Sequence, residues 1–262
     1  MILGLLSVVA IACLWFTGSL HPGDLDKRRR NVSAYPALTW LLAGVAVFLA
    51  MMIGATLAGA ALGVRESDSE AASAPSVLVG YAMAIGVGAW LMHIFSRGAG
   101  RAGLGVQWMD PLIGVAWLAI AAGPILLTTQ TAVLTFQAIT GTAAESLAHP
   151  SLRELAEGGA GVWLIIVSAV IGAPIVEEMT YRVFLQSSIL RLTRSPWAAV
   201  LLTSVPFTLM HAPAVPVYGL ATLFVLSVAI GLAYERTGRA GVPIAMHMAF
   251  NAANIAVAMQ VA

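Results

Sequence analysis

The stretch PALTWLLAGVAVFLAMMIGATLAGAALG at residues 36–63 decides the fold class, because it contains no charged residue along its whole length. A helix of roughly 20 apolar residues crosses the hydrocarbon core of a bilayer, and this stretch is longer than that. The rest of the chain has the same character: 60% of the 262 residues are hydrophobic and only 10% are charged. Soluble domains carry about 25% charged residues. We therefore expect lipid to surround most of the chain.

Seven further apolar segments predict an all-α fold, a polytopic membrane helix bundle with about eight transmembrane helices. Helices are expected because lipid cannot satisfy backbone polar groups, and the sequence lacks the short alternating segments that are typical of membrane strands. The expected helices span residues 2–20, 36–63, 75–96, 111–137, 161–190, 196–211, 215–233 and 241–260.

Lysine and arginine residues are concentrated in every second loop between these segments. The first, third, fifth and seventh loops hold ten basic residues, whereas the other three hold only Arg65 and Arg153. Because positive charge marks the cytoplasmic side of a membrane, this alternation predicts both termini outside. The polar segment 140–160 then lies outside, where Ser151 and Glu154 could form the capping box of a short surface helix.

Other properties of the sequence indicate where the protein is located and which partners it lacks the charge to bind. Lys27 and Arg28 follow the apolar N-terminal run instead of preceding it, which predicts a retained first helix and not a secretory signal. Short loops, many alanines and the charge pattern favour a bacterial inner (cell) membrane. The net charge is +1, which gives no basic excess for nucleic acid. The single Cys13 cannot form an intramolecular disulfide.

A few ionisable residues fall inside the apolar segments, where such residues are costly and by default mark a functional site. Glu178 and Arg182 are four residues apart, so they share a helix face and can pair. Glu177 is rotated by about 100° on the same helix and is left for chemistry. The alternative for this segment is an ion pair that only locks two helices together. The six residues are His93, Glu177, Glu178, Arg182, His211 and His247.

The two later histidines add to this cluster. His211 ends the sixth segment, and His247 shares a face with Asn251 at the start of the eighth. At 1.5 Å per residue, the helix lengths bring Glu177, His211 and His247 to the cytoplasmic half of the bilayer. His93 has no polar companion, and we interpret it as an interfacial or core residue.

Glu-Glu-x-x-x-Arg, Phe-x-x-x-His and His-x-x-x-Asn, in this order on three apolar segments, resemble the motifs of the CPBP family of CAAX proteases and bacteriocin-processing proteins. The family includes the CAAX prenyl endopeptidases. The resemblance covers residues 161–257, within a helical region of residues 111–262, and residues 1–110 are expected to be accessory transmembrane helices. It implies an intramembrane endopeptidase that acts on a membrane-associated peptide or protein.

The resemblance also implies residue roles. Glu177 and His211 would activate water against a peptide carbonyl, and Glu178 with Arg182 would fix that arrangement. His247 and Asn251 would stabilise the developing oxyanion. Glu177, His211 and His247 could alternatively hold zinc with one open position. The sequence leaves open whether the enzyme is a metalloprotease or a metal-independent glutamate protease.

Two hypotheses from other functional classes compete with proteolysis. A proton-coupled transporter or carrier could use the intramembrane carboxylates as a relay, although such proteins are commonly built from repeats and the sequence shows none. A binding scaffold with the same fold would have no need for six polar groups in lipid. Retained cleavage after Glu177→Gln and His211→Ala would contradict the protease hypothesis.

Overall fold

The computed structural model describes residues 2–27, 29–65, 69–143 and 161–261, and the predicted helix at Ser151–Glu154 lies outside these residues. Within them, helices form all the regular secondary structure. A long helix made of five consecutive parts carries the glutamate pair. These parts are α7 (Val162–Val167), η1 (Ser168–Gly172), α8 (Ala173–Glu178), η2 (Met179–Gln186) and α9 (Ser187–Thr193). The other helices are α1 (Ile2–Phe16), α2 (Pro22–Lys27), α3 (Ala37–Leu62), α4 (Glu70–Gly98), α5 (Asp110–Thr140), α10 (Pro196–Met210), α11 (Val217–Thr237) and α12 (Gly241–Val261).

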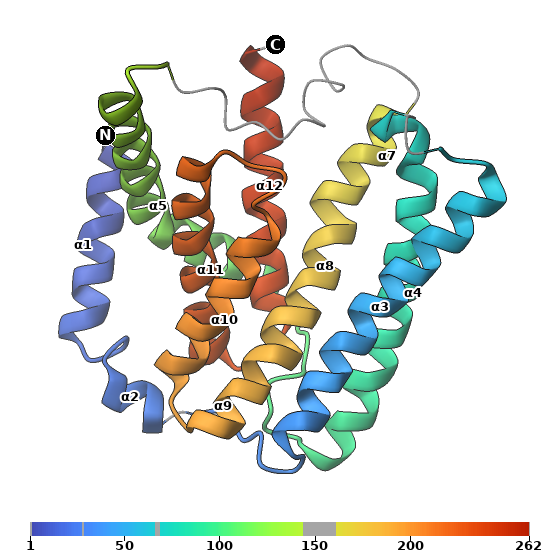
Figure 1. Ribbon diagram of the computed structural model, residues 1–262. Coiled ribbons are helices and arrows are strands. Elements are labelled where there is room, and N and C mark those ends of the chain that lie inside the picture. The colour runs from blue at the N-terminus through green and yellow to red at the C-terminus, as the bar shows by residue number, and fades with distance from the viewer. Residues whose placement is uncertain (1, 28, 66–68, 144–160, 262) are drawn as a thin grey trace.

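All eight apolar segments are helical, which confirms the predicted polytopic helix bundle (Figure 1). In the described part of the chain, six helices are long and apolar enough to cross a membrane: residues 37–62, 71–98, 110–140, 162–193, 217–237 and 241–260. The helices α1 and α10 are shorter, with 15 residues each. The number of spans therefore stays a prediction, whereas the integral membrane character of the protein is clear.

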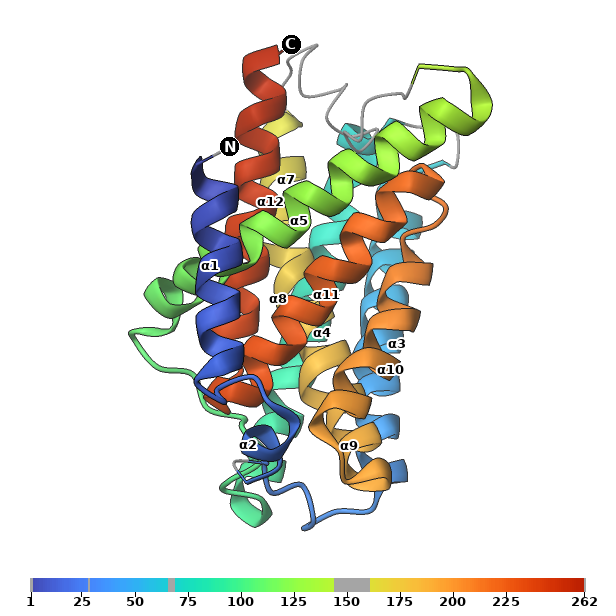
Figure 2. The same ribbon diagram turned by 90° about the vertical axis from the view of Figure 1, so that its left-hand side faces the viewer.

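The long helices run up and down alternately, so that α1 begins and α12 ends at the same end of the bundle (Figures 1 and 2). Four loops that each contain arginine meet at the opposite end. We call it the basic end and define it by residues 17–27, 29–36, 99–109, 194–195 and 238–240. Backbone N–H of Asn31 donates to the Arg101 carbonyl at 3.0 Å, and Arg29 donates to the Arg194 carbonyl at 2.6 Å. The alternation of charge along the sequence thus corresponds to one physical end of the molecule.

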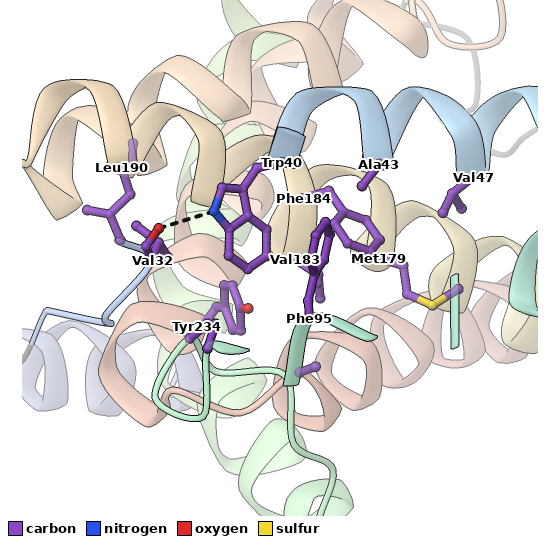
Figure 3. Packing of buried hydrophobic residues seen from close by; sticks show 14 of the residues in the cluster. Val32, Trp40, Ala43, Val47, Phe95, Met179, Val183, Phe184, Leu190 and Tyr234 are labelled. Atoms are coloured by element: carbon purple, nitrogen blue, oxygen red, sulfur yellow. Dashed lines mark hydrogen bonds between the residues drawn. The ribbon is translucent and has the colours of Figure 1, made fainter. Parts of the chain in front are cut away.

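The main apolar core lies between α3, α4 and η2, close to the basic end (Figure 3). Trp40 is completely buried there, and its ring lies 4.8 Å from that of Phe95. Its indole N–H donates to the Val32 carbonyl at 3.2 Å. Val183 and Phe184 complete this core from η2. The first two long helices therefore support the helix that carries the glutamate pair.

The outer faces of the bundle are apolar, as lipid contact requires. Large apolar side chains are exposed along α3 even though the helix packs tightly on its other side; they are Leu38, Leu42, Val45, Leu49, Met52, Ile53 and Leu57. Water would penalise so much continuous apolar surface, whereas hydrocarbon does not. The inside of the bundle instead holds the polar groups.

Candidate active site

The glutamate pair lies where the long helix changes from α-helical to π-helical geometry. Glu177 and Glu178 end α8, and η2 begins at the next residue, Met179. Such π-helical turns are rare and occur frequently at functional sites. The core around Phe184 packs against one side of η2, and α10 and α11 pack against the other, while α12 packs against α8. The two carboxylates consequently point at different partners.

Glu178 is buried in a fully occupied hydrogen-bond arrangement. Arg182 Nε donates to its Oε2 at 3.0 Å, and both side chains are 0% exposed. The other oxygen, Oε1, lies 2.8 Å from His247 Nδ1. Arg182 also donates from Nη2 to Ser227 Oγ on α11 at 2.9 Å. The pairing of Glu178 with Arg182 that the sequence predicted is present, and it extends to two further helices.

Glu177 has a different environment and faces His211. Its Oε2 lies 3.7 Å from His211 Nε2, and each of these side chains is 26% exposed. This carboxylate oxygen is itself buried and makes no hydrogen bond among the described residues. His211 Nδ1 lies 2.8 Å from the Phe207 carbonyl, which can only accept, so Nδ1 carries a proton. In the neutral ring, Nε2 is then an acceptor directed at Glu177.

Phe207 is the apolar centre of the cluster, and the sequence pattern indicated no role for it beyond its place in a motif. Its buried ring lies 4.8 Å from the ring of His211 and 5.9 Å from that of His247. The Arg182 guanidinium carbon is 5.0 Å from its centroid. The ring therefore contacts both histidines and the arginine. Its spacing of four residues from His211 was the available signal, whereas nothing in the sequence indicated Ser227.

Asn251 lies one helical turn beyond His247 and binds a different element. Its Nδ2 donates to the Ala169 carbonyl in η1 at 2.8 Å. Asn251 thus attaches α12 to the first π-helical segment of the long helix. Five predicted site residues thus lie together around Phe207: Glu177, Glu178, Arg182, His211 and His247. The sixth, Asn251, joins α12 to the long helix that carries the glutamate pair.

The predicted zinc ligands do not form a metal site in this arrangement. Among the described residues, no three His, Cys, Asp or Glu side chains are grouped closely enough to hold a metal ion. Glu177 and His211 are near each other, and His247 uses Nδ1 for Glu178 and keeps Nε2 available. Such a carboxylate contact is compatible with metal binding through the other nitrogen, so the poor fit to a three-ligand zinc centre rests on the spacing of the three side chains.

His93 lies elsewhere, on an exposed part of α4. Its Nε2 lies 3.1 Å from an Arg97 nitrogen, and its side chain lines a cavity of about 330 Å³ beside Gly100 and Leu104. These contacts agree with the interpretation of His93 as an interfacial residue.

Comparison with known families identifies the C-terminal part of the chain. Residues 159–253 match the family model described as type II CAAX prenyl endopeptidase Rce1-like. The matched segment contains all six predicted site residues and almost coincides with the predicted range of 161–257. Comparisons with curated proteins and with solved structures gave no match.

Proposed function

We propose that residues 159–253, which match the Rce1-like family model, form a CAAX-type intramembrane endopeptidase domain in which Glu177 and His211 activate the water that cleaves the peptide bond. The observation that carries the proposal is the pair of acceptors facing each other, Glu177 Oε2 and His211 Nε2, at 3.7 Å. Two acceptors cannot hydrogen-bond to each other, but a water molecule beside them can donate one hydrogen to each.

The chemical step follows from these acceptors. Glu177 takes a proton from the water while the water oxygen attacks the peptide carbonyl carbon. The tetrahedral intermediate then collapses with cleavage of the C–N bond, and the proton held by Glu177 passes to the leaving amine. His211 holds the second hydrogen of the water, and the Phe207 carbonyl fixes the tautomer that makes this possible.

The proposed oxyanion donors need a specific protonation state. Because Glu178 accepts a hydrogen bond from His247 Nδ1, His247 can donate through Nε2 only as the imidazolium. A cation at this position would stabilise the negative charge that develops on the carbonyl oxygen. Asn251 uses one amide N–H for Ala169 and retains a second one for the substrate.

We propose that this chemistry proceeds without a metal. The donor set of the described residues offers Glu177 and His211 but no third ligand beside them. A chelator such as 1,10-phenanthroline should leave cleavage unchanged within about twofold, a free-energy difference of roughly 0.4 kcal/mol. Loss of activity on chelation, with recovery on adding zinc, would contradict this part of the proposal.

The proposed substrate is a membrane-associated peptide or protein in a bacterial inner membrane, cleaved in the cytoplasmic half of the bilayer. The proposal rests on the membrane-embedded position of the domain and on the charge asymmetry of the loops. Suitable probes are quenched fluorescent peptides in which three residues follow a farnesylated cysteine at the C-terminus. Their unprenylated counterparts and a membrane-spanning peptide complete the set.

The test compares three variants in lipid nanodiscs. Glu177→Gln and His211→Ala should each lower cleavage by at least about 100-fold, the lower end of the range for loss of a general base. His93→Ala replaces another histidine of an apolar helix and should retain cleavage. A wild-type protein that cleaves none of the probes, or variants at Glu177 and His211 that cleave normally, would overturn the proposal.

A further inference from the structure

A second buried ion pair lies at the basic end, between Arg30 of the N-terminal segment and Glu235 of α11. Arg30 Nη2 lies 2.6 Å from Glu235 Oε1, and Arg30 Nε donates to Oε2 at 3.1 Å. The two side chains are 2% and 1% exposed. A buried pair of this kind adds little net stability because desolvation offsets the attraction, but leaving one partner alone is costly. The residues that contact the Arg30–Glu235 pair therefore indicate its role.

Arg30 joins three parts of the chain that are distant in sequence. Its Nη1 donates to the Ala102 carbonyl at 2.8 Å and to Ser187 Oγ at 2.9 Å. The backbone of Gly103 has a φ of +90°, and a Cβ atom there would lie 2.8 Å from Arg30 Cδ. The α4–α5 loop is thus shaped around this arginine, which also contacts the first residue of α9.

Glu235 connects the arginine to the end of η2. Gln186, the last residue of η2, donates from Nε2 to Glu235 Oε1 at 2.8 Å and to the Gly231 carbonyl at 3.3 Å. Gln186 lies four residues after Arg182, which donates to Ser227. The long helix and α11 thus each contribute a row of residues that are four positions apart. We call the two facing rows the polar ladder: Glu178, Arg182 and Gln186 on the long helix, and Ser227, Gly231 and Glu235 on α11.

We propose that Arg30 is a positioning residue of the active site, acting through the polar ladder. By holding Glu235, it holds Gln186 and with it the end of η2. π-helical segments are rare, so we expect contacts with neighbouring helices to determine whether η2 persists. Arg182 in η2 donates to Glu178, which lies just before the segment and contacts His247. This inference rests on the proposed function for its catalytic meaning, but the geometry that it concerns is independent of it.

The charges along the polar ladder explain how loss of Arg30 would affect the contact between Glu178 and His247. Glu178 with Arg182, and Glu235 with Arg30, are two neutral pairs on one ladder. Without Arg30, Glu235 becomes a buried anion, which is costly unless a cation approaches. Gln186 donates to Glu235, so a displaced Glu235 carboxylate shifts Gln186 and the end of η2. Arg182 lies four residues earlier in the same segment and donates to Glu178, so the contact of Glu178 with His247 would change as well.

The experiment measures the His247 side chain directly. Protein labelled with 15N-histidine is studied by NMR in nanodiscs, and the His247 signal is assigned by its loss in His247→Gln. Arg30→Met should move the His247 Nδ1 resonance, and Arg30→Lys should restore only part of it, because lysine cannot make the bidentate contact. Gln186→Met cuts the ladder but keeps the Arg30–Glu235 pair, and it should move the same resonance.

The matched control is Asp24→Asn. Asp24 pairs with Arg236 at 2.7 Å, so this ion pair also ties the N-terminal segment to the end of α11, next to Glu235 but outside the ladder. We expect the His247 signal to be unchanged in this variant. An unchanged signal in Arg30→Met, or an equal shift in Asp24→Asn, would overturn the inference. Should Arg30→Met fail to fold, Gln186→Met decides in the same way.

Cleavage provides a second readout that separates positioning from general stability. On a probe that the wild type cleaves, kcat of Arg30→Met should fall about 10- to 100-fold with KM nearly unchanged, as expected for a small misplacement of reacting groups. Asp24→Asn should keep both constants. The NMR result does not depend on activity, so failure of the proposed function and failure of this inference remain distinguishable.

Discussion

Glu177 and Glu178 are neighbours along the chain, yet their surroundings give them opposite tasks. Glu178 has both oxygens engaged, by Arg182 and by His247. Glu177 has a buried oxygen with no hydrogen bond among the described residues, and its nearest polar partner is His211 at 3.7 Å. A carboxylate whose two oxygens are both hydrogen-bonded holds structure, whereas one that faces a histidine acceptor is suited to proton transfer through a water beside the pair.

This contrast predicts different losses in the two amide variants. Glu178→Gln leaves Arg182 as a buried, uncompensated charge, which should cost about 3–5 kcal/mol of unfolding free energy. Glu177→Gln should change stability by less than about 1 kcal/mol, because no hydrogen bond is lost, and yet abolish cleavage. Thermal unfolding in detergent and peptide cleavage, measured on the same preparations, check both. Equal destabilisation by the two variants would contradict the division of roles.

The sequence predicted the local contacts at this scale and missed the distant ones. Glu178 and Arg182 are four apart, so any helix brings them together. Arg30 was counted as a loop charge, but the structure buries it against Glu235. Glu235 was missed because the seventh segment was expected to end at 233, whereas α11 continues to Thr237. A contact between residues 205 positions apart depends on packing, which no local spacing encodes.

At the scale of elements, small residues decide how closely the helices approach. A Cβ atom on Gly80 of α4 would lie 2.6 Å from the Met51 carbonyl and 3.0 Å from the Ala55 nitrogen, both backbone atoms of α3. Backbone cannot move aside as a flexible side chain can. Small residues commonly permit such contacts between membrane helices. The same α3–α4 pair forms the wall of the core behind η2.

We therefore expect Gly80→Ala to be destabilising, by about 1–3 kcal/mol, the usual cost of overpacking. Gly86 on the same helix is the control, because a Cβ atom there meets nothing within 4 Å. Gly86→Ala should be neutral, or stabilising by up to about 1 kcal/mol through helix propensity. Thermal unfolding of both variants tests the packing. Equal melting temperatures would show that α3 and α4 do not approach each other so closely.

The element boundaries show where sequence patterns suffice. Proline and glycine breakers and long apolar runs identified all eight helical segments, for example 36–63 against the observed Ala37–Leu62. The π-helical segments η1 and η2 were not predicted, because a π-turn differs from an α-turn only in which backbone groups pair. That choice follows from contacts such as those of Gln186 and Asn251 with neighbouring helices.

At the scale of the whole molecule, the basic end gives the bundle a direction. Four arginine-bearing loops meet there, and α1 begins and α12 ends at the other end (Figure 1). Arginine in short loops stays on the cytoplasmic side during insertion. If the basic end is cytoplasmic, the N-terminal segment with Arg30 reaches the site from the cytoplasm, and both termini face outward.

Cysteine labelling in intact cells tests this orientation, because Cys13→Ser removes the single native thiol. Ser33→Cys and Thr193→Cys lie near the basic end, and Thr142→Cys and Gln260→Cys lie near the other end, all at exposed positions. A membrane-impermeant maleimide should label the second pair in intact cells and the first pair only after permeabilisation. The reverse pattern would invert the orientation and place the arginine loops outside. Labelling of both pairs from one side would contradict a bundle whose two ends face opposite sides of the membrane.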